Sequence, residues 1–243
     1  MTRFSRFLAA LAAALLLSAP GVRAGGPAPV VVELFTSQGC SACPPADAFL
    51  GELAGREDVI ALSLHVDYWD YLGWRDSFSI PAAVSRQVAY RDRFDKRMVY
   101  TPQMVVQGRA EAVGSARREV ERLIAAARDG GRGAAIPIAP GAGGGLVARL
   151  APGRMEGGAL WLARYRREAR VKVARGENAG RRLAYHNVVV SLSPLGRWDG
   201  KTRRELPLPM PGQGEGVALW VQAPGIGPIR AAGRYEPEPD AME

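Results

Sequence analysis

The chain has 243 residues, of which 32 are basic and 24 acidic, so its formal net charge is +8 at neutral pH. Two cysteines are too few for a disulfide-stapled scaffold, and no later apolar run approaches the ~20 residues of a membrane-spanning helix. No interleaving of basic and aromatic residues and no recognition helix supports nucleic-acid binding. We therefore expect no nucleic-acid partner and no integral membrane span after the N-terminal segment.

Residues 1–24 are typical of a secretory signal. Arg3 and Arg6 form its basic start, residues 7–17 its apolar stretch, and residues 22–24 a small-residue cleavage site. Removing this segment lowers the net charge to +5, because it takes away three arginines and no acid. A retained N-terminal anchor is the alternative. We expect a periplasmic or secreted protein, whose cysteines meet an oxidising environment.

The remainder divides near Gly130 into two segments of different pattern. In residues 25–130, buried-type strands alternate with helices, which predicts an α/β domain with parallel strands. Residues 131–234 contain short β-like runs separated by glycine, proline or polar clusters, which is typical of a small all-β, sandwich-like domain. The acidic tail, residues 235–243, is expected to be flexible.

The second of these segments carries the basic charge. Residues 131–234 contain 17 basic and 6 acidic side chains. Such an asymmetry predicts a surface for an anionic partner on the β domain. The alternative is that the arginines decorate solvated strand faces without binding anything.

The only two cysteines, Cys40 and Cys43, directly follow the apolar run 30–35. A strand that ends in CxxC and continues into a helix is typical of a redox site. A helix that begins at the first cysteine directs its free N–H groups at that sulfur and stabilises the thiolate. We therefore expect Cys40, the more exposed of the two, to attack, Cys43 to resolve the mixed disulfide, and the pair to close into a disulfide.

Thr101 and Pro102 precede a later short strand. Strand, CxxC, helix, strand, inserted helix, Thr-Pro, hairpin and helix is the element order of the thioredoxin fold, which this part of the chain resembles. The resemblance implies a cis bond before Pro102, close to the cysteines, with Thr101 offering backbone groups to a substrate. A structural trans-proline is the alternative. The predicted class is α/β: a thioredoxin-like N-terminal domain followed by a small all-β (sandwich-like) C-terminal domain.

Glu33 lies in the strand that enters the motif. Thioredoxins have a buried carboxylate at a similar offset, so the resemblance implies that Glu33 assists proton transfer at Cys43, with a pKa raised by burial. The alternative is an edge or loop-facing Glu33 held by an arginine. Both interpretations stay open.

Residues 65–74 leave the second predicted strand at the edge of the sheet where Cys40 is expected. Trp69, Trp74 and Asp67 are candidates for a substrate groove, and Asp67 or Asp70 could tune the thiols. The alternative is a capping loop whose tryptophans pack over the core.

The sequences of several segments resemble one particular family, which is more specific than a resemblance in fold. The chain resembles the exported bacterial proteins of domain-of-unknown-function family 1223, which is classed as thioredoxin-like. The segments that carry this resemblance are residues 33–47, 65–74, 100–103, 176–178 and 185–189. The resemblance implies fold and address but no activity.

Three functions follow from these patterns. The first is a thiol-disulfide oxidoreductase that acts on protein thiols or disulfides, without a cofactor or resident metal. The second is Cu(I) handling by the CxxC thiolates, with Met98, Met104 or His65 as further ligands. The third is a non-catalytic binding module with a permanent disulfide. We interpret His186, inside a strand-like run, as a structural residue.

Overall fold

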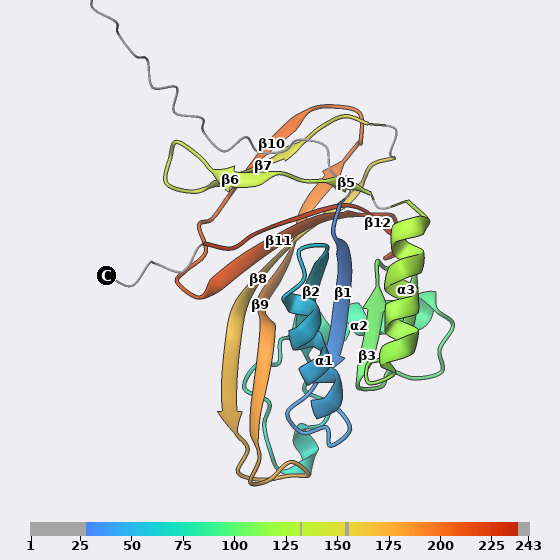
Figure 1. Cartoon of the computed structure of the whole chain (residues 1–243), viewed down its shortest axis with the longest axis vertical. Coiled ribbons are helices and arrows are strands. Elements are labelled where there is room, and N and C mark those ends of the chain that lie inside the picture. The colour runs from blue at the N-terminus through green and yellow to red at the C-terminus, as the bar shows by residue number, and fades with distance from the viewer. Residues whose placement is uncertain (1–27, 132, 154–155, 238–243) are drawn as a thin grey trace, which may run out of the picture.

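The computed structural model describes residues 28–131, 133–153 and 156–237 (Figure 1). The predicted signal segment and most of the predicted acidic tail lie outside these residues. The helices are α1 (Pro44–Ala54), α2 (Pro81–Arg93) and α3 (Arg117–Asp129), with a 3-10 turn at Asp70–Leu72. The strands are β1 (Val30–Thr36), β2 (Val59–His65), β3 (Gln103–Val106), β4 (Ala110–Val113), β5 (Ala134–Ala135), β6 (Ile138–Pro140), β7 (Leu146–Leu150), β8 (Gly158–Lys172), β9 (Arg182–Trp198), β10 (Arg204–Leu208), β11 (Glu215–Gln222) and β12 (Ile229–Tyr235).

One mixed sheet runs through most of the described chain. Its nine strands follow the order β4-β3-β1-β2-β9-β8-β11-β12-β5. β1 pairs in parallel with β2, as a strand-helix-strand unit predicts, and antiparallel with β3. A second sheet, β10-β7-β6, contains three strands.

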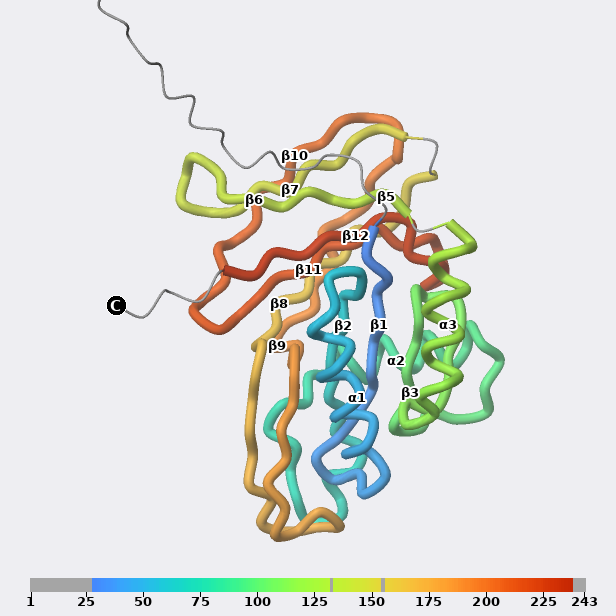
Figure 2. Tube along the Cα trace, in the orientation of Figure 1, coloured from blue at the N-terminus to red at the C-terminus, as the bar shows by residue number. Residues whose placement is uncertain are grey.

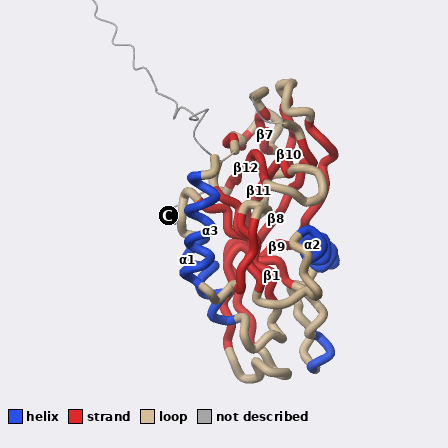
Figure 3. Tube along the Cα trace, turned by 90° about the vertical axis from the view of Figure 1, so that its right-hand side faces the viewer, coloured by secondary structure: helices blue, strands red, loops and turns tan. Residues whose placement is uncertain are grey.

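Alternation along β1 assigns its side chains to two cores. Val30, Val32 and Leu34 face α1 and α3, whereas Val31 and Phe35 belong to the core under α2. Figure 3 shows α1 and α3 on one side of the sheet and α2 on the other. A third core lies between the two sheets, where Leu146 and Leu206 join Leu160 and Leu219.

The expected division into an α/β thioredoxin-like N-terminal domain and a separate small all-β, sandwich-like domain is wrong. The protein is mostly β, because strands from the C-terminal segment extend the N-terminal sheet. β9 joins β2 through a bridge between Ser63 and Val188, and Asn187 donates a hydrogen bond to the carbonyl of Ala61 (2.9 Å). β2 would otherwise be an edge strand with unpaired backbone groups.

β8 and β9 are 15 and 17 residues long and form a hairpin that reaches past the N-terminal strands. Its turn, residues 173–181, lies at the end of the molecule where β1 runs into α1, as the tube in Figure 2 shows. No helix within the described ranges is long and apolar enough to cross a membrane.

Candidate functional site

Cys40 and Cys43 form a disulfide with a Cα–Cα distance of 5.4 Å. α1 begins at Pro44, so the N-cap is Cys43, whose carbonyl accepts the amides of Ala46 (2.8 Å) and Asp47 (3.0 Å). The helix therefore starts one turn after Cys40, because Pro44 and Pro45 favour the first helical positions. Cys40 lies in the preceding turn.

The disulfide is almost completely covered. Cys40 is 1% exposed and Cys43 0% exposed, so the expected difference in exposure between them is very small. Only Ser41 and Ala42, between the cysteines, are exposed to solvent. Any partner approaching the intact structure therefore meets these two residues before it meets sulfur.

The tip of the β8–β9 hairpin supplies part of the cover. The buried Asn178 side chain donates hydrogen bonds to the carbonyls of Gln38 (3.0 Å) and Cys40 (2.9 Å) and accepts one from Arg181 (2.9 Å). Gly176, at φ +76°, brings the same turn against Trp74. Sequence reasoning singled out this turn only through the family resemblance and missed the role of Asn178.

The loop after β2 packs against the segment that precedes Cys40. Trp69 packs beside Gly39 through its Cβ and backbone, since an added β-carbon at Gly39 would lie 3.0 Å from the Trp69 Cβ. Its indole donates a hydrogen bond to Thr101 Oγ1 (2.8 Å). Trp74 donates to the Gln38 side chain (2.9 Å). Both tryptophans thus adjoin the CxxC loop, whereas Asp67 points to solvent.

The Thr101–Pro102 peptide bond is cis, as predicted. Pro102 is buried beside the first turn of α1, because a β-carbon at Gly114 would lie 3.2 Å from the Cβ of Pro102 and 3.0 Å from that of Ala46. The structure therefore brings Thr101, Pro102, Trp69 and the cysteines together. Their catalytic roles stay predictions.

A buried carboxylate that sequence reasoning missed lies under the motif. Asp47 is one helical turn after Cys43, is 4% exposed, and accepts a hydrogen bond from Thr36 Oγ1 (2.7 Å). Burial raises its pKa from 3.8 to about 7, although His65 and the bond from Thr36 lower it. The spacing of four residues from Cys43, which places both on one helix face, is the signal that could have found it.

His65 and Asp76 form a second buried pair on this face of the sheet. His65 Nδ1 and Asp76 Oδ2 are 2.8 Å apart, and both side chains are completely buried. Asp76 also accepts the backbone amide of Gln38 (2.8 Å), so it ties the loop after β2 to the segment before Cys40. Asp76, not Asp67 or Asp70, is therefore the carboxylate of this loop that reaches the motif.

Several polar atoms around these groups have no hydrogen-bond partner within the described chain. They are Asp47 Oδ2, Ser63 Oγ, His65 Nε2 and the Tyr185 hydroxyl. The rings of His65 and Tyr185 are 4.7 Å apart, and burial, with contributions from Asp47 and Asp76, raises the pKa of Tyr185. Buried polar atoms of this kind are ordinarily satisfied by ordered water.

Glu33 is completely buried, but on the other face of the sheet. Its carboxylate pairs side-on with the guanidinium of Arg86, through Nε and through Nη2 (3.0 Å), and accepts a hydrogen bond from the Tyr90 hydroxyl (2.6 Å). An arginine thus holds Glu33, as one interpretation anticipated, although the residue is central rather than at an edge. The carboxylate on the face of α1 is Asp47.

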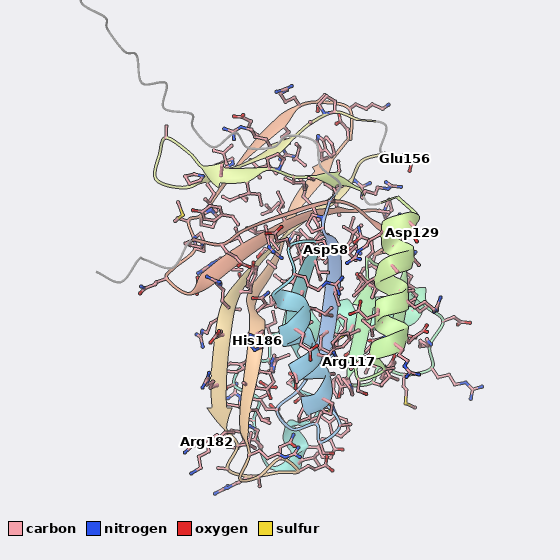
Figure 4. The ribbon with its side chains drawn as sticks, in the orientation of Figure 1. Asp58, Arg117, Asp129, Glu156, Arg182 and His186 are labelled. Carbon is pink, nitrogen blue, oxygen red and sulfur yellow. A yellow bond between two sulfur atoms is a disulfide. The ribbon has the colours of Figure 1, made fainter. Side chains whose placement is uncertain are left out.

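The residues considered for copper do not converge. Met98 is 69% exposed, whereas Met104 is buried in the core under α1 and α3. In the part of the chain that the structure describes, no group of three or more His, Cys, Asp or Glu side chains is placed to hold a metal ion. His186 packs its ring against Gly51 of α1, between helix and strand (Figure 4), which fits a structural residue.

The basic residues of the C-terminal segment gather partly on the β8–β9 hairpin. Arg170, Lys172 and Arg182 line a hollow of about 310 Å³ near its tip, and Figure 4 shows Arg182 at that end of the molecule. An anionic partner for this surface stays a prediction.

One known protein family matches most of this chain. The family model described as "Protein of unknown function (DUF1223)" matches residues 31–222, which include both cysteines and the Asn178 turn. The chain belongs to this DUF1223 family. No curated protein matches it.

Two solved structures resemble this DUF1223 protein. The crystal structure of protein AGR_C_4864 from Agrobacterium tumefaciens is 31% identical, with a TM-score of 0.76 over 90% of this chain and 98% of that one. HBP35 of Porphyromonas gingivalis is 18% identical, with a TM-score of 0.55 over 89% of this chain and 78% of that one. The second likeness supports the fold alone.

Proposed function

We propose that this DUF1223 protein is a thiol-disulfide oxidoreductase in which Cys40 and Cys43 alternate between disulfide and dithiol. The observation that carries the proposal is the placement of the pair at the start of α1, one helical turn from a buried carboxylate with a pKa of about 7. A carboxylate of this kind can accept or donate a proton near neutral pH.

In the reductive direction, the Cys40 thiolate attacks a substrate disulfide and releases one substrate thiolate. Cys43 then loses its proton to Asp47, and its thiolate attacks Cys40 Sγ of the mixed disulfide. The second substrate thiolate leaves, the Cys40–Cys43 disulfide forms, and two electrons have passed to the substrate. The oxidative direction is the reverse of these steps.

Burial of the pair sets a condition on the reaction. Because both cysteines are covered, substrate access to Cys40 requires the Trp69 side chain or the Asn178 turn to move away. The exposed Ser41 and Ala42 offer the first contact surface for a protein substrate. We place the reaction in the periplasm or outside the cell, on the strength of residues 1–24.

The burial of both cysteines also favours one other candidate function, a binding module whose disulfide stays closed.

The two candidates are distinguished by redox titration of the native protein in dithiothreitol buffers, with acid quenching, thiol alkylation and mass measurement. A reversible two-electron transition supports the oxidoreductase. A potential near that of thioredoxin, about −270 mV, indicates a reductase, and one near about −120 mV indicates an oxidant.

Activity is tested in parallel by insulin reduction and by refolding of a reduced disulfide protein, with Cys40→Ser as the control. If the disulfide resists excess dithiothreitol until the protein is unfolded, and wild type and Cys40→Ser are equally inactive, the module replaces the oxidoreductase.

A further inference from the structure

A cavity of about 540 Å³ lies between α2 and the sheet, on the face opposite α1. Its walls come from α2, β8, β9 and the segment that follows β11, and include Trp161, Leu192, Pro194 and Ile226. This size falls within the ~300–1,000 Å³ typical of small-molecule sites. Most of the wall is apolar.

The polar part of the wall is positively charged. Arg86 and Arg197 line the cavity, and its described lining includes no acidic side chain. Arg197 is exposed, whereas Arg86 is 3% exposed and its guanidinium lies 5.2 Å from the ring centroids of both Trp161 and Trp220. Glu33 neutralises one of the two charges and leaves the other.

Arg86 keeps part of its hydrogen-bonding capacity unused. Its Nε and Nη2 atoms face Glu33, and Nη2 also bonds the Tyr90 hydroxyl and the Gln222 side chain. Because the guanidinium is planar, Nη1 points away from Glu33, and it has no hydrogen-bond partner within the described chain. A buried donor left unpaired is destabilising, so an acceptor is expected there.

We propose that this cavity binds a small apolar carboxylate. The carboxylate lies between Arg86 and Arg197, where Nη1 donates to it, and the apolar body packs against Trp161, Leu192 and Ile226. The site is separate from the cysteines, because the sheet lies between it and α1. It therefore stands or falls independently of the proposed redox function.

The probe is 4-phenylbutyrate, with 4-phenylbutanol as the matched neutral compound. Tryptophan fluorescence and calorimetry of the oxidised protein should show saturable binding of the carboxylate, at least tenfold weaker binding of the alcohol, and at least fivefold weaker carboxylate binding by Arg197→Gln. Ala89→Trp, on the cavity side of α2, should abolish binding. Ala48→Trp, exposed on α1, is the matched control and should bind normally.

Circular dichroism of each variant establishes that it is folded. The proposal is overturned if the carboxylate shows no saturable binding, or if folded Ala89→Trp binds as wild type does. If 4-phenylbutyrate and 4-phenylbutanol bind equally well, the site does not select a carboxylate. Water is then the hydrogen-bond partner of Arg86. Cys40→Ser should bind the carboxylate like wild type, so failure of the redox function leaves this test intact.

Discussion

The side-chain amide of Asn178 donates a hydrogen bond of 2.9 Å to the carbonyl of Cys40, although 138 residues separate them in the chain. The same amide bonds the carbonyl of Gln38 at 3.0 Å. Two buried acceptors beside the disulfide therefore depend on a hairpin turn from the far half of the sequence.

Asn178→Ala should destabilise the oxidised protein by about 1–3 kcal/mol, because both carbonyls lose a buried donor. It should also speed reduction of the disulfide by dithiothreitol, because the turn no longer holds the loop. Urea unfolding and alkylation kinetics measure the two effects. Ser41→Ala, at an exposed position between the cysteines, is the control. Unchanged kinetics in Asn178→Ala would show that the turn does not control access.

Trp69→Phe and Thr101→Val each remove the hydrogen bond between these side chains while keeping most of the shape. A net hydrogen bond contributes about 0.5–1.5 kcal/mol, so each variant should be reduced roughly two- to tenfold faster. If the bond is responsible, the double variant should be no faster than the faster single one. Additive effects in the double variant would mean that the two residues act separately.

Asp47→Asn should change how stability depends on pH. The folded-state pKa of Asp47, about 7, exceeds its unfolded value of 3.8, so the folded state holds more protons between these values. The unfolding free energy of wild type therefore falls as pH rises from about 4 to 7, by up to about 4 kcal/mol from this group. Asp47→Asn should lack that fall.

The measurement is urea unfolding at pH 4, 5.5, 7 and 8 with the disulfide intact, and the quantity compared is the difference between variant and wild type. Asp67→Asn makes the same chemical change at an exposed carboxylate and is the matched control. Parallel curves for wild type and Asp47→Asn would place the pKa of Asp47 near its ordinary value.

Gly51→Ala should destabilise the protein, although alanine normally stabilises a helix interior by about 1 kcal/mol relative to glycine. A β-carbon at Gly51 would lie 2.5 Å from Cδ2 of His186, and such overpacking typically costs about 1–3 kcal/mol. Thermal unfolding should show recovery in the Gly51→Ala/His186→Ala double variant. Gly55→Ala, at the C-cap of the same helix, should be nearly neutral, because the nearest atom to its β-carbon would be the Glu52 carbonyl oxygen at 3.6 Å, an ordinary contact.

Periodicity and turn signals located most strands and helices, because those patterns report which residues face a core. These patterns do not show which strand pairs with an edge strand. β9 pairs with β2 at Ser63 and Val188, so the two units that we expected share one sheet. Alternation along β1 places Glu33 on the same face of the sheet as Val31 and Phe35. The sequence does not show whether the cysteines lie on that face or on the opposite one.

Around the cysteines, local spacing was informative and distant contacts were not. The thioredoxin resemblance implied the cis bond before Pro102, and the loop after the second strand offered Trp69 as a candidate. Asp47 was missed, although its helical spacing from Cys43 could have revealed it. The cover over Cys40 could not be derived, because Asn178 carries no local signal of what it touches.

The distance along the chain between Cys40 and Asn178 has a consequence for synthesis. Proteins are made from the N-terminus, so Cys40 and Cys43 leave the ribosome 138 and 135 residues before the turn that covers them. During that interval both thiols are open to any oxidant or partner thiol. The two cysteines are therefore accessible in the nascent chain, whereas Trp69 and Asn178 restrict access to them in the folded protein.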